Sequence, residues 1–231
     1  YVKTLFTSYY NYNSVALLIG AFICMLQLYA DFSGAMDIVI GISKMIGIEL
    51  PENFDRPYFS ESVQEFWHRW HISLGNWMRD YVFYPFALTK TMQKISGWCL
   101  NHLGKHFAKS ISACISNILV FVLVGIWHGP ELHFLLWGLY NGLVIALSDL
   151  LKPCFEKINT LLHINVKSKA MYIFRIIRTF IIVNIGWYFD RIYDVKKSFI
   201  FLKNSITNFK LSQFSLSLKF LFNDVSHVSS K

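Results

Sequence analysis

Long apolar blocks separated by short polar segments dominate the hydrophobic pattern of this chain. The blocks cover residues 15–30, 35–50, 111–127, 132–151 and 171–189. Each is long enough to enter or span a bilayer, whose hydrocarbon core takes roughly 17 to 25 residues of helix. The pattern therefore predicts an all-α fold, that of a polytopic helical membrane protein.

A polar interruption separates the first two blocks. Asp31, Phe32, Ser33 and Gly34 place a carboxylate, a hydroxyl and a glycine between them. Because irregular or polar backbone at membrane depth persists only where protein or a water-filled cavity covers it, we expect a broken or re-entrant helix pair here. Asp31 and Asp37 are then either helix-cap and packing residues near an interface or residues that line a polar cavity.

The character of the chain changes in residues 51–85, which are rich in Trp, Tyr, His and Arg. Amphipathic aromatic side chains of this kind settle at the depth of the lipid headgroups. The segment predicts an amphipathic helix at the membrane surface, beginning near Ser60. Ser62 and Glu65 have the spacing of a capping box, which supports a helix start at this point.

Helical spacing also relates the charged side chains of this segment. Glu65 and Arg69 lie four residues apart, and His68 and His71 lie three apart, so each pair is predicted to share a face of the helix. Glu65, His68 and His71 resemble part of a metal site, but the His-Glu-x-x-His order of zinc proteases is absent. We expect no metal to bind there.

The remaining connections are short or polar. Gly129 and Pro130 predict a tight turn between two spans, and residues 196–206 have the pattern of a short amphipathic helix. Residues 207–231 form a polar, serine-rich tail without an interpretable pattern.

Composition agrees with a lipid setting, since 54% of the residues are hydrophobic and 16% are charged, against about 25% charged in ordinary soluble domains. The net charge of +8 could suggest a nucleic-acid partner. However, the lysines gather in the connections 90–109 and 152–169, and basic connections tend to stay in the cytoplasm. We therefore expect both connections on the cytoplasmic side and no nucleic-acid partner. The four scattered cysteines say little about the redox compartment.

His128 is the first candidate for chemistry, because it directly follows the uncharged block 111–127. An ionisable side chain at membrane depth costs about 3 kcal/mol or more, and such residues usually face a polar cavity or carry function. No nucleophile elbow, Walker loop or dinucleotide fingerprint is present, which leaves acid-base catalysis by a neutral imidazole. A histidine that only hydrogen-bonds across helices is the alternative. A second histidine group, Cys99, His102 and His106, lacks a fourth metal ligand, so no metal is expected there either.

Six motif segments follow one another in a specific order. They are Gln27-Leu28-Tyr29-Ala30-Asp31-Phe32-Ser33-Gly34, Leu50-Pro51-Glu52-Asn53-Phe54-Asp55-Arg56-Pro57-Tyr58, Glu65-Phe66-Trp67-His68-Arg69-Trp70-His71-Ile72-Ser73-Leu74, Trp77-Met78-Arg79-Asp80-Tyr81, Gly125-Ile126-Trp127-His128-Gly129 and Leu135-Leu136-Trp137-Gly138-Leu139-Tyr140-Asn141-Gly142. Together they strongly resemble the membrane-bound O-acyltransferase family. More narrowly, they are similar to its bacterial branch, which contains alginate and peptidoglycan O-acetyltransferases and the teichoic-acid D-alanylation acyltransferase. The resemblance covers residues 10–206.

The resemblance implies a multi-helix membrane enzyme built around a central tunnel. The near-invariant histidine of the family corresponds to His128, and its second histidine corresponds to His71, whereas no role transfers to His68. Tunnel-lining or structural support is expected of Asp31, Asp37, Arg79 and Asp80. Members of this branch are longer, so we expect a fragment truncated at both ends. Residues 1–206 are the C-terminal part of such a domain, and residues 207–231 stay unassigned.

The resemblance further implies transfer of an acyl group, with acetyl favoured, in a multi-pass protein of the bacterial plasma membrane. The donor is expected to be a cytoplasmic thioester, acyl-CoA or another one, with no permanently bound cofactor. The acceptor is expected to be a hydroxyl of an extracytoplasmic polysaccharide or of an acyl-relay protein. The long basic connection between Tyr84 and Ser110 favours the acetylating branch over D-alanyl transfer to teichoic acid. A non-catalytic scaffold or polymer-export subunit is the alternative of another class.

Overall fold

The computed structural model describes residues 14–207 of the chain. Within this range the elements are helices, so the predicted all-α class is confirmed. Four of the described helices are long and apolar enough to cross a membrane, and they contain all the predicted apolar blocks except the ends of two. They are α2 (Ser14–Met45), α7 (Lys105–His128), α8 (Leu132–Leu150) and α10 (Lys169–Arg191). Of the predicted tail 207–231 only Thr207 is described, and residues 208–231 lie outside the described residues.

The expected helix break in the first two blocks is wrong. Helix α2 runs without interruption from Ser14 to Met45, so the turn from Asp31 to Gly34 is part of one continuous helix. Its residues can all adopt helical dihedral angles, and the cost of a single interior glycine is about 1 kcal/mol relative to alanine. This cost is too small to end a helix of 32 residues.

The described chain divides into two compact units, and the divisions fall within α2 and α10. One unit contains the first part of α2, the end of α10 and helix α11 (Val195–Thr207). The core of this unit is formed by Leu17, Ala21, Tyr188, Ile192 and Phe201. The helix predicted at residues 196–206 is present as α11, which contributes Phe201 to this core, whereas Phe199, Ile200 and Ile206 of the same helix are exposed.

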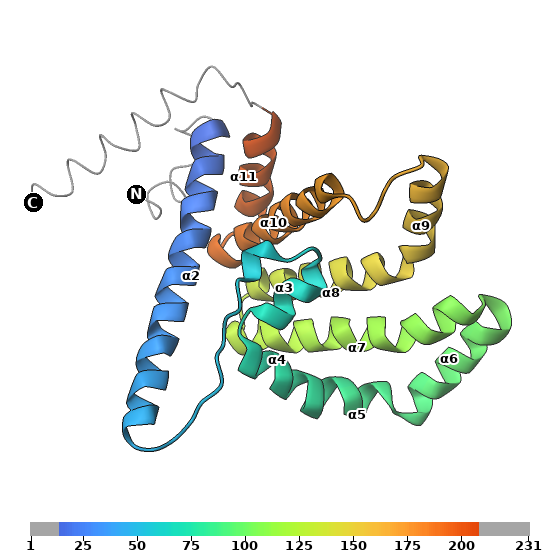
Figure 1. Cartoon of the computed structure of the whole chain (residues 1–231), viewed down its shortest axis with the longest axis horizontal. Coiled ribbons are helices and arrows are strands. Elements are labelled where there is room, and N and C mark those ends of the chain that lie inside the picture. The colour runs from blue at the N-terminus through green and yellow to red at the C-terminus, as the bar shows by residue number, and fades with distance from the viewer. Residues whose placement is uncertain (1–13, 208–231) are drawn as a thin grey trace, which may run out of the picture. The chain divides into compact units, whose positions relative to one another are not determined.

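The other unit, residues 36–183, is organised around the antiparallel pair α7 and α8, which lie side by side (Figure 1). The predicted tight turn at Gly129 and Pro130 joins them, since α7 ends at His128 and α8 begins at Leu132. The two helices approach closely at glycines. A Cβ atom at Gly138 would meet the backbone oxygen of Phe121, and one at Gly142 would lie 2.9 Å from the Cα of Ile118. Small residues of this kind allow membrane helices to pack backbone to backbone.

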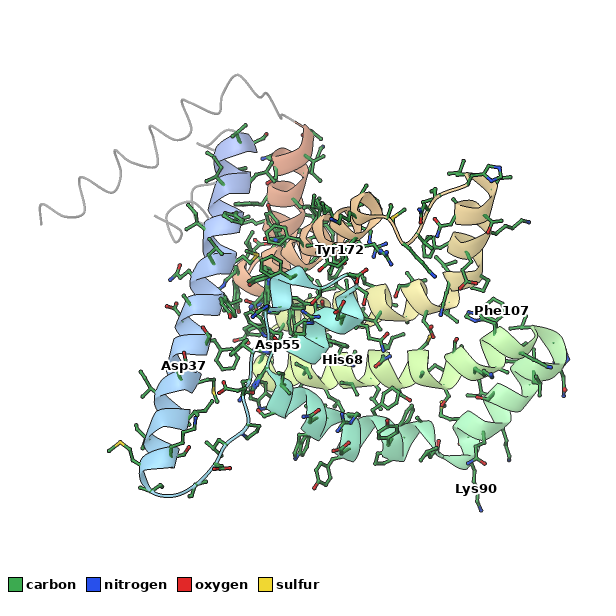
Figure 2. The ribbon with its side chains drawn as sticks, in the orientation of Figure 1. Asp37, Asp55, His68, Lys90, Phe107 and Tyr172 are labelled. Atoms are coloured by element: carbon green, nitrogen blue, oxygen red, sulfur yellow. The ribbon has the colours of Figure 1, made fainter. Side chains whose placement is uncertain are left out.

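The basic connections contain helices of their own. Helix α6 (Lys90–His102) packs against α7, and helix α9 (Lys152–Leu161) follows α8. Lys90, labelled in Figure 2, is the first residue of α6. The ring atom Nε2 of His106, at the start of α7, lies 3.0 Å from the backbone oxygen of Asp149, near the end of α8. The two basic connections therefore lie at the same end of the α7–α8 pair, and His128 lies at the opposite end.

The predicted surface helix of residues 51–85 is divided into short elements. After η2 (Pro57–Phe59) come α3 (Val63–Arg69), α4 (Ile72–Met78), the π-helix η3 (Arg79–Phe83) and α5 (Tyr84–Ala87). The predicted cap is confirmed, because Oγ of Ser62 accepts a hydrogen bond from the backbone N–H of Glu65 at 3.1 Å. The predicted pair of Glu65 and Arg69 is also present, as an ion pair at 2.6 Å.

Candidate functional site

The junction between α3 and α4 is tied to the preceding loop by backbone hydrogen bonds. The N–H of Asp55 donates to the oxygen of Arg69, and the N–H of Ile72 donates to the oxygen of Asn53, both at 3.0 Å. This short antiparallel contact pairs Phe54 with Trp70. As a result, the residue between Trp70 and Ile72 is held from both sides.

That residue is His71, which adopts a left-handed backbone conformation with φ of 49°. A residue other than glycine reaches this region at a cost of about 1 kcal/mol or more, so its surroundings must hold it there. Because α3 ends at Arg69, the expected common helix face of His68 and His71 does not exist. His68 is exposed on α3 (Figure 2), whereas His71 is half-buried beyond its end.

The side chain of Asn53 contributes much of the hydrogen bonding around the backbone of His71. Its Oδ1 accepts hydrogen bonds from the N–H of Ser73 at 3.1 Å and from the hydroxyl of Ser73 at 2.6 Å. The same oxygen lies 3.1 Å from Nδ1 of His71. Asn53 itself is buried, with 3% of its surface exposed. No local signal in the sequence distinguishes Asn53, which stands among the charged residues Glu52, Asp55 and Arg56 of its motif.

His128 is the last residue of α7, and its side chain is exposed in the described part of the chain. Aromatic rings surround it, with the centroid of Trp137 at 5.0 Å, that of Trp127 at 5.1 Å and that of Phe134 at 5.8 Å. Trp137 is buried in α8 and in turn lies edge-on to Trp67 of α3, with the ring centroids 5.5 Å apart. The imidazole is therefore held on one side by aromatic rings while another side stays open.

The structure brings the two predicted histidines together, although they come from different elements. Burial, and next the positive charge of His128, lower the pKa of His71 below its ordinary value of 6.5. At neutral pH His71 is accordingly a neutral imidazole, which has one N–H donor and one nitrogen acceptor. A neutral imidazole can accept a proton from a bound hydroxyl at its nitrogen without hydrogen and, as an imidazolium, return it.

The four residues expected to line a tunnel or support it are exposed in the described chain. Asp31 and Asp37 lie on α2, and Figure 2 labels Asp37. Arg79 and Asp80 form an ion pair at 2.8 Å at the start of η3. The hydrogen bond from Arg79 lowers the pKa of Asp80, and the carboxylate of Asp80 raises the pKa of Arg79. A tunnel role for any of the four stays a prediction.

Within residues 14–207, no group of three or more His, Cys, Asp or Glu side chains is close enough to hold a metal ion. The members of the Cys99 group have separate surroundings. His102 stacks on Trp98 at 4.6 Å between ring centroids, whereas His106 contacts the backbone of α8. Cys99 is buried in α6.

Comparison with known proteins agrees with this arrangement. The sequence profile of the membrane-bound O-acyltransferase family matches residues 2–189. The chain belongs to this family. It is therefore a multi-pass membrane protein, as its apolar helices indicate.

Several relatives within the membrane-bound O-acyltransferase family are similar over most of this chain. A probable alginate O-acetylase of Pseudomonas syringae pv. tomato is 34% identical over 73% of the chain and 27% of its own length. A teichoic acid D-alanyltransferase of Bacillus subtilis is 34% identical over 71% of the chain and 38% of its own length. A peptidoglycan O-acetyltransferase of Helicobacter pylori is 30% identical over 78% of the chain and 29% of its own length. The chain thus spans between about a quarter and two fifths of the length of these relatives.

Proposed function

We propose that this chain carries the histidine pair of an O-acyltransferase in the bacterial plasma membrane. The enzyme moves an acyl group, with acetyl favoured, from acyl-CoA or another cytoplasmic thioester to a hydroxyl outside the cytoplasm. That hydroxyl belongs to a cell-envelope polysaccharide or to an acyl-relay protein. The observation that carries the proposal is that His71 lies close enough to His128 to feel its charge, in a chain of this family.

In the proposed reaction His128 is the general base. It takes the proton from the acceptor hydroxyl as the hydroxyl oxygen attacks the carbonyl carbon of the thioester. The C–S bond then breaks, the imidazolium returns the proton to the leaving thiolate, and the products are an ester and a free thiol. An imidazolium at this position lies at the C-terminal end of α7, where helix carbonyl groups favour a positive charge. His71 positions or polarises one of the two substrates.

The position of His128 along α7 supports an acceptor outside the cytoplasm. The basic connections lie at the other end of the α7–α8 pair, and basic segments tend to remain in the cytoplasm. His128 then lies toward the opposite face of the membrane. The family tunnel implied by the resemblance would carry the thioester to it.

The test is substitution of the histidines in the full-length gene product, followed by mass analysis of ester-linked acyl groups on envelope polymers. His128→Ala is expected to reduce transfer by about 10² to 10⁴, with membrane insertion unchanged. His71→Ala is expected to reduce it as well. His68→Ala is the matched control, because His68 is an exposed histidine three residues before His71, and it is expected to keep near wild-type transfer.

The identity of the lost group separates the alternatives. Loss of ester-linked acetyl supports the acetylating activity, whereas loss of ester-linked alanine assigns the protein to D-alanyl transfer. The similar identity to relatives of both kinds makes this distinction necessary. Unchanged polymer acylation in the His128→Ala variant, together with a defect in polymer export, would sink the enzyme assignment in favour of a scaffold.

A further inference from the structure

Helix α9 is short, and none of its ten residues is buried within the part of the chain that the structure describes. Isolated helices of fewer than about 12 residues are only marginally stable in water. The large apolar side chains of Phe155, Ile158 and Leu161 are nevertheless 49%, 48% and 74% exposed. An exposed apolar surface of this kind is typical of a site that binds lipid or another protein.

The residues of α9 divide into an apolar face and a polar face. At 3.6 residues per turn, five apolar side chains fall within an arc of about 120°. They are Cys154, Phe155, Ile158, Leu161 and the C-cap residue Leu162. Glu156 and Thr160 lie opposite this arc, and the hydroxyl of Thr160 donates to the backbone oxygen of Glu156 at 2.9 Å. A short helix divided in this way is typical of one that lies in the plane of a membrane interface.

The charges of α9 are distributed according to the same division. Lys152 and Lys157 flank the apolar arc on its two sides, about 60° from Phe155 and about 40° from Leu161. Glu156, the acidic residue of this helix, lies near the middle of the opposite face. Long lysine side chains can bury their stems along an apolar surface and extend their charges to the headgroups. An apolar layer covered by anionic groups, as in a membrane with acidic phospholipids, complements this arrangement.

The position of α9 in the chain places it at the surface of a bilayer. Helix α8 is long and apolar enough to cross the membrane and ends at Leu150, and α9 begins at Lys152. Pro153 has no N–H with which to continue the hydrogen bonds of α8. Figure 1 shows that α9 turns away from the line of α8. A helix that starts two residues after the end of a span and leaves its direction lies along the membrane surface.

We propose that α9 binds the anionic headgroup region of the membrane, with its apolar face inserted and with Lys152 and Lys157 on lipid phosphates. The apolar face then enters to a depth of about 5 to 10 Å, which anchors the adjoining end of α8. This surface lies at the end of the α7–α8 pair that carries the basic connections, opposite His128. The proposal therefore goes beyond acyl transfer and does not depend on it.

The first test measures the depth of each face of α9 in the full-length protein, in nanodiscs that contain phosphatidylglycerol. A nitroxide label is attached to Cys154 on the apolar face, with the other cysteines replaced by alanine. The matched control carries the label at Thr160→Cys on the polar face, in a Cys154→Ser background. Electron paramagnetic resonance is expected to show the label at Cys154 colliding mainly with oxygen, which concentrates in lipid. The control label is expected to collide mainly with a water-soluble nickel chelate.

Two results of this measurement would overturn the proposal. Equal collision of both labels with the nickel chelate would place the apolar face in water. A label at Cys154 that is shielded from both reagents would show that another protein segment covers this face.

The second test keeps the native cysteines and follows backbone hydrogen exchange of α9. The full-length protein is compared in nanodiscs of phosphatidylcholine with and without phosphatidylglycerol, and the α9 amides are expected to exchange more slowly with the anionic lipid. A lysine near an anionic surface contributes about fivefold to binding, so Lys152→Gln with Lys157→Gln is expected to accelerate exchange there by about 30-fold.

Lys90→Gln with Lys94→Gln is the matched control, because it removes the same charge from α6, whose Met92 and Cys99 are buried. This variant is expected to leave the exchange of α9 unchanged. Equal exchange of α9 in the two kinds of nanodisc, or an equal effect of the two double variants, would overturn the proposal.

Discussion

Trp67 donates its indole N–H to Oδ1 of Asn141 at 3.2 Å, which joins α3 to α8. The Trp67 ring also packs edge-on against Trp137, the residue whose ring lies 5.0 Å from that of His128. Helix α3, which ends two residues before His71, therefore packs against α8, and Trp137 of α8 contacts the ring of His128. This contact links the placement of the two histidines.

Trp67→Phe tests the hydrogen bond while it retains most of the ring packing. The change leaves Oδ1 of Asn141, a residue with 2% of its surface exposed, without the indole donor. We expect a loss of about 1 to 3 kcal/mol in the free energy of unfolding, because a buried amide oxygen loses its partner. Chemical denaturation of the purified protein in detergent measures this loss.

A double-mutant cycle provides the control. Asn141→Leu removes the acceptor, so Trp67→Phe should cost less in that background than in the wild-type protein. Additive losses in the double variant would show that the hydrogen bond does not couple the two residues.

The second prediction concerns the close approach of α7 and α8 at Gly138. A methyl group at Gly138 would collide with the backbone of Phe121, which cannot rotate away as a side chain could. We expect Gly138→Ala to reduce stability by about 1 to 3 kcal/mol and to lower the yield of folded protein. Gly97→Ala on α6 is the matched control, since nothing lies within 4 Å of the added atom. It is expected to be neutral or to stabilise by about 0.5 to 1 kcal/mol, and equal losses in the two variants would contradict the packing argument.

A third prediction concerns the ion pair between α10 and the start of α3. Nε of Arg175 lies 3.2 Å from Oε2 of Glu61, and the two side chains are 32% and 36% exposed. Because a partly exposed pair is screened by solvent, Glu61→Gln is expected to cost at most about 1 kcal/mol, and less at high salt. The hydrogen bond from Arg178 to the backbone oxygen of Glu61 is unaffected by this change. Thermal unfolding at low and high salt measures this cost. A loss of stability well above about 1 kcal/mol that does not change with salt would contradict a weak, solvent-screened ion pair.

The long helices and the start of α3 could be predicted from sequence, because the length of an apolar block and the identity of a cap residue are local features of the chain. The predicted blocks 111–127, 132–151 and 171–189 correspond to α7, α8 and α10, and Ser62 caps α3 as expected. The predicted break at Asp31 to Gly34 is wrong, because a carboxylate, a hydroxyl and a glycine all permit helical geometry. The connection at residues 90–109 contains helix α6, with Met92 and Cys99 forming its buried side.

The candidate site could be predicted only in part. His71 and His128 were identified through family motifs, whereas their mutual placement depends on contacts between segments far apart in the chain. The role of Asn53 depends on a loop with irregular backbone and on the left-handed conformation of His71, and neither has a periodic signature. Such a contact follows from tertiary structure and not from local propensity.

The burial of His71 and its proximity to His128 predict a dependence of stability on pH. The pKa of His71 is lowered in the folded protein, so the unfolded chain binds more protons as the pH falls through the ordinary value of 6.5. Stability is therefore expected to fall as the pH is lowered through and below this value, and to be fully present above it. His71→Gln removes the titrating group and should flatten this dependence. His128→Gln removes the smaller of the two causes, the neighbouring positive charge, and should reduce the dependence without abolishing it, because burial remains. Thermal unfolding in detergent between about pH 7.5 and 5 measures all three proteins, and a slope in His71→Gln as steep as in the wild-type protein would locate the effect at another histidine.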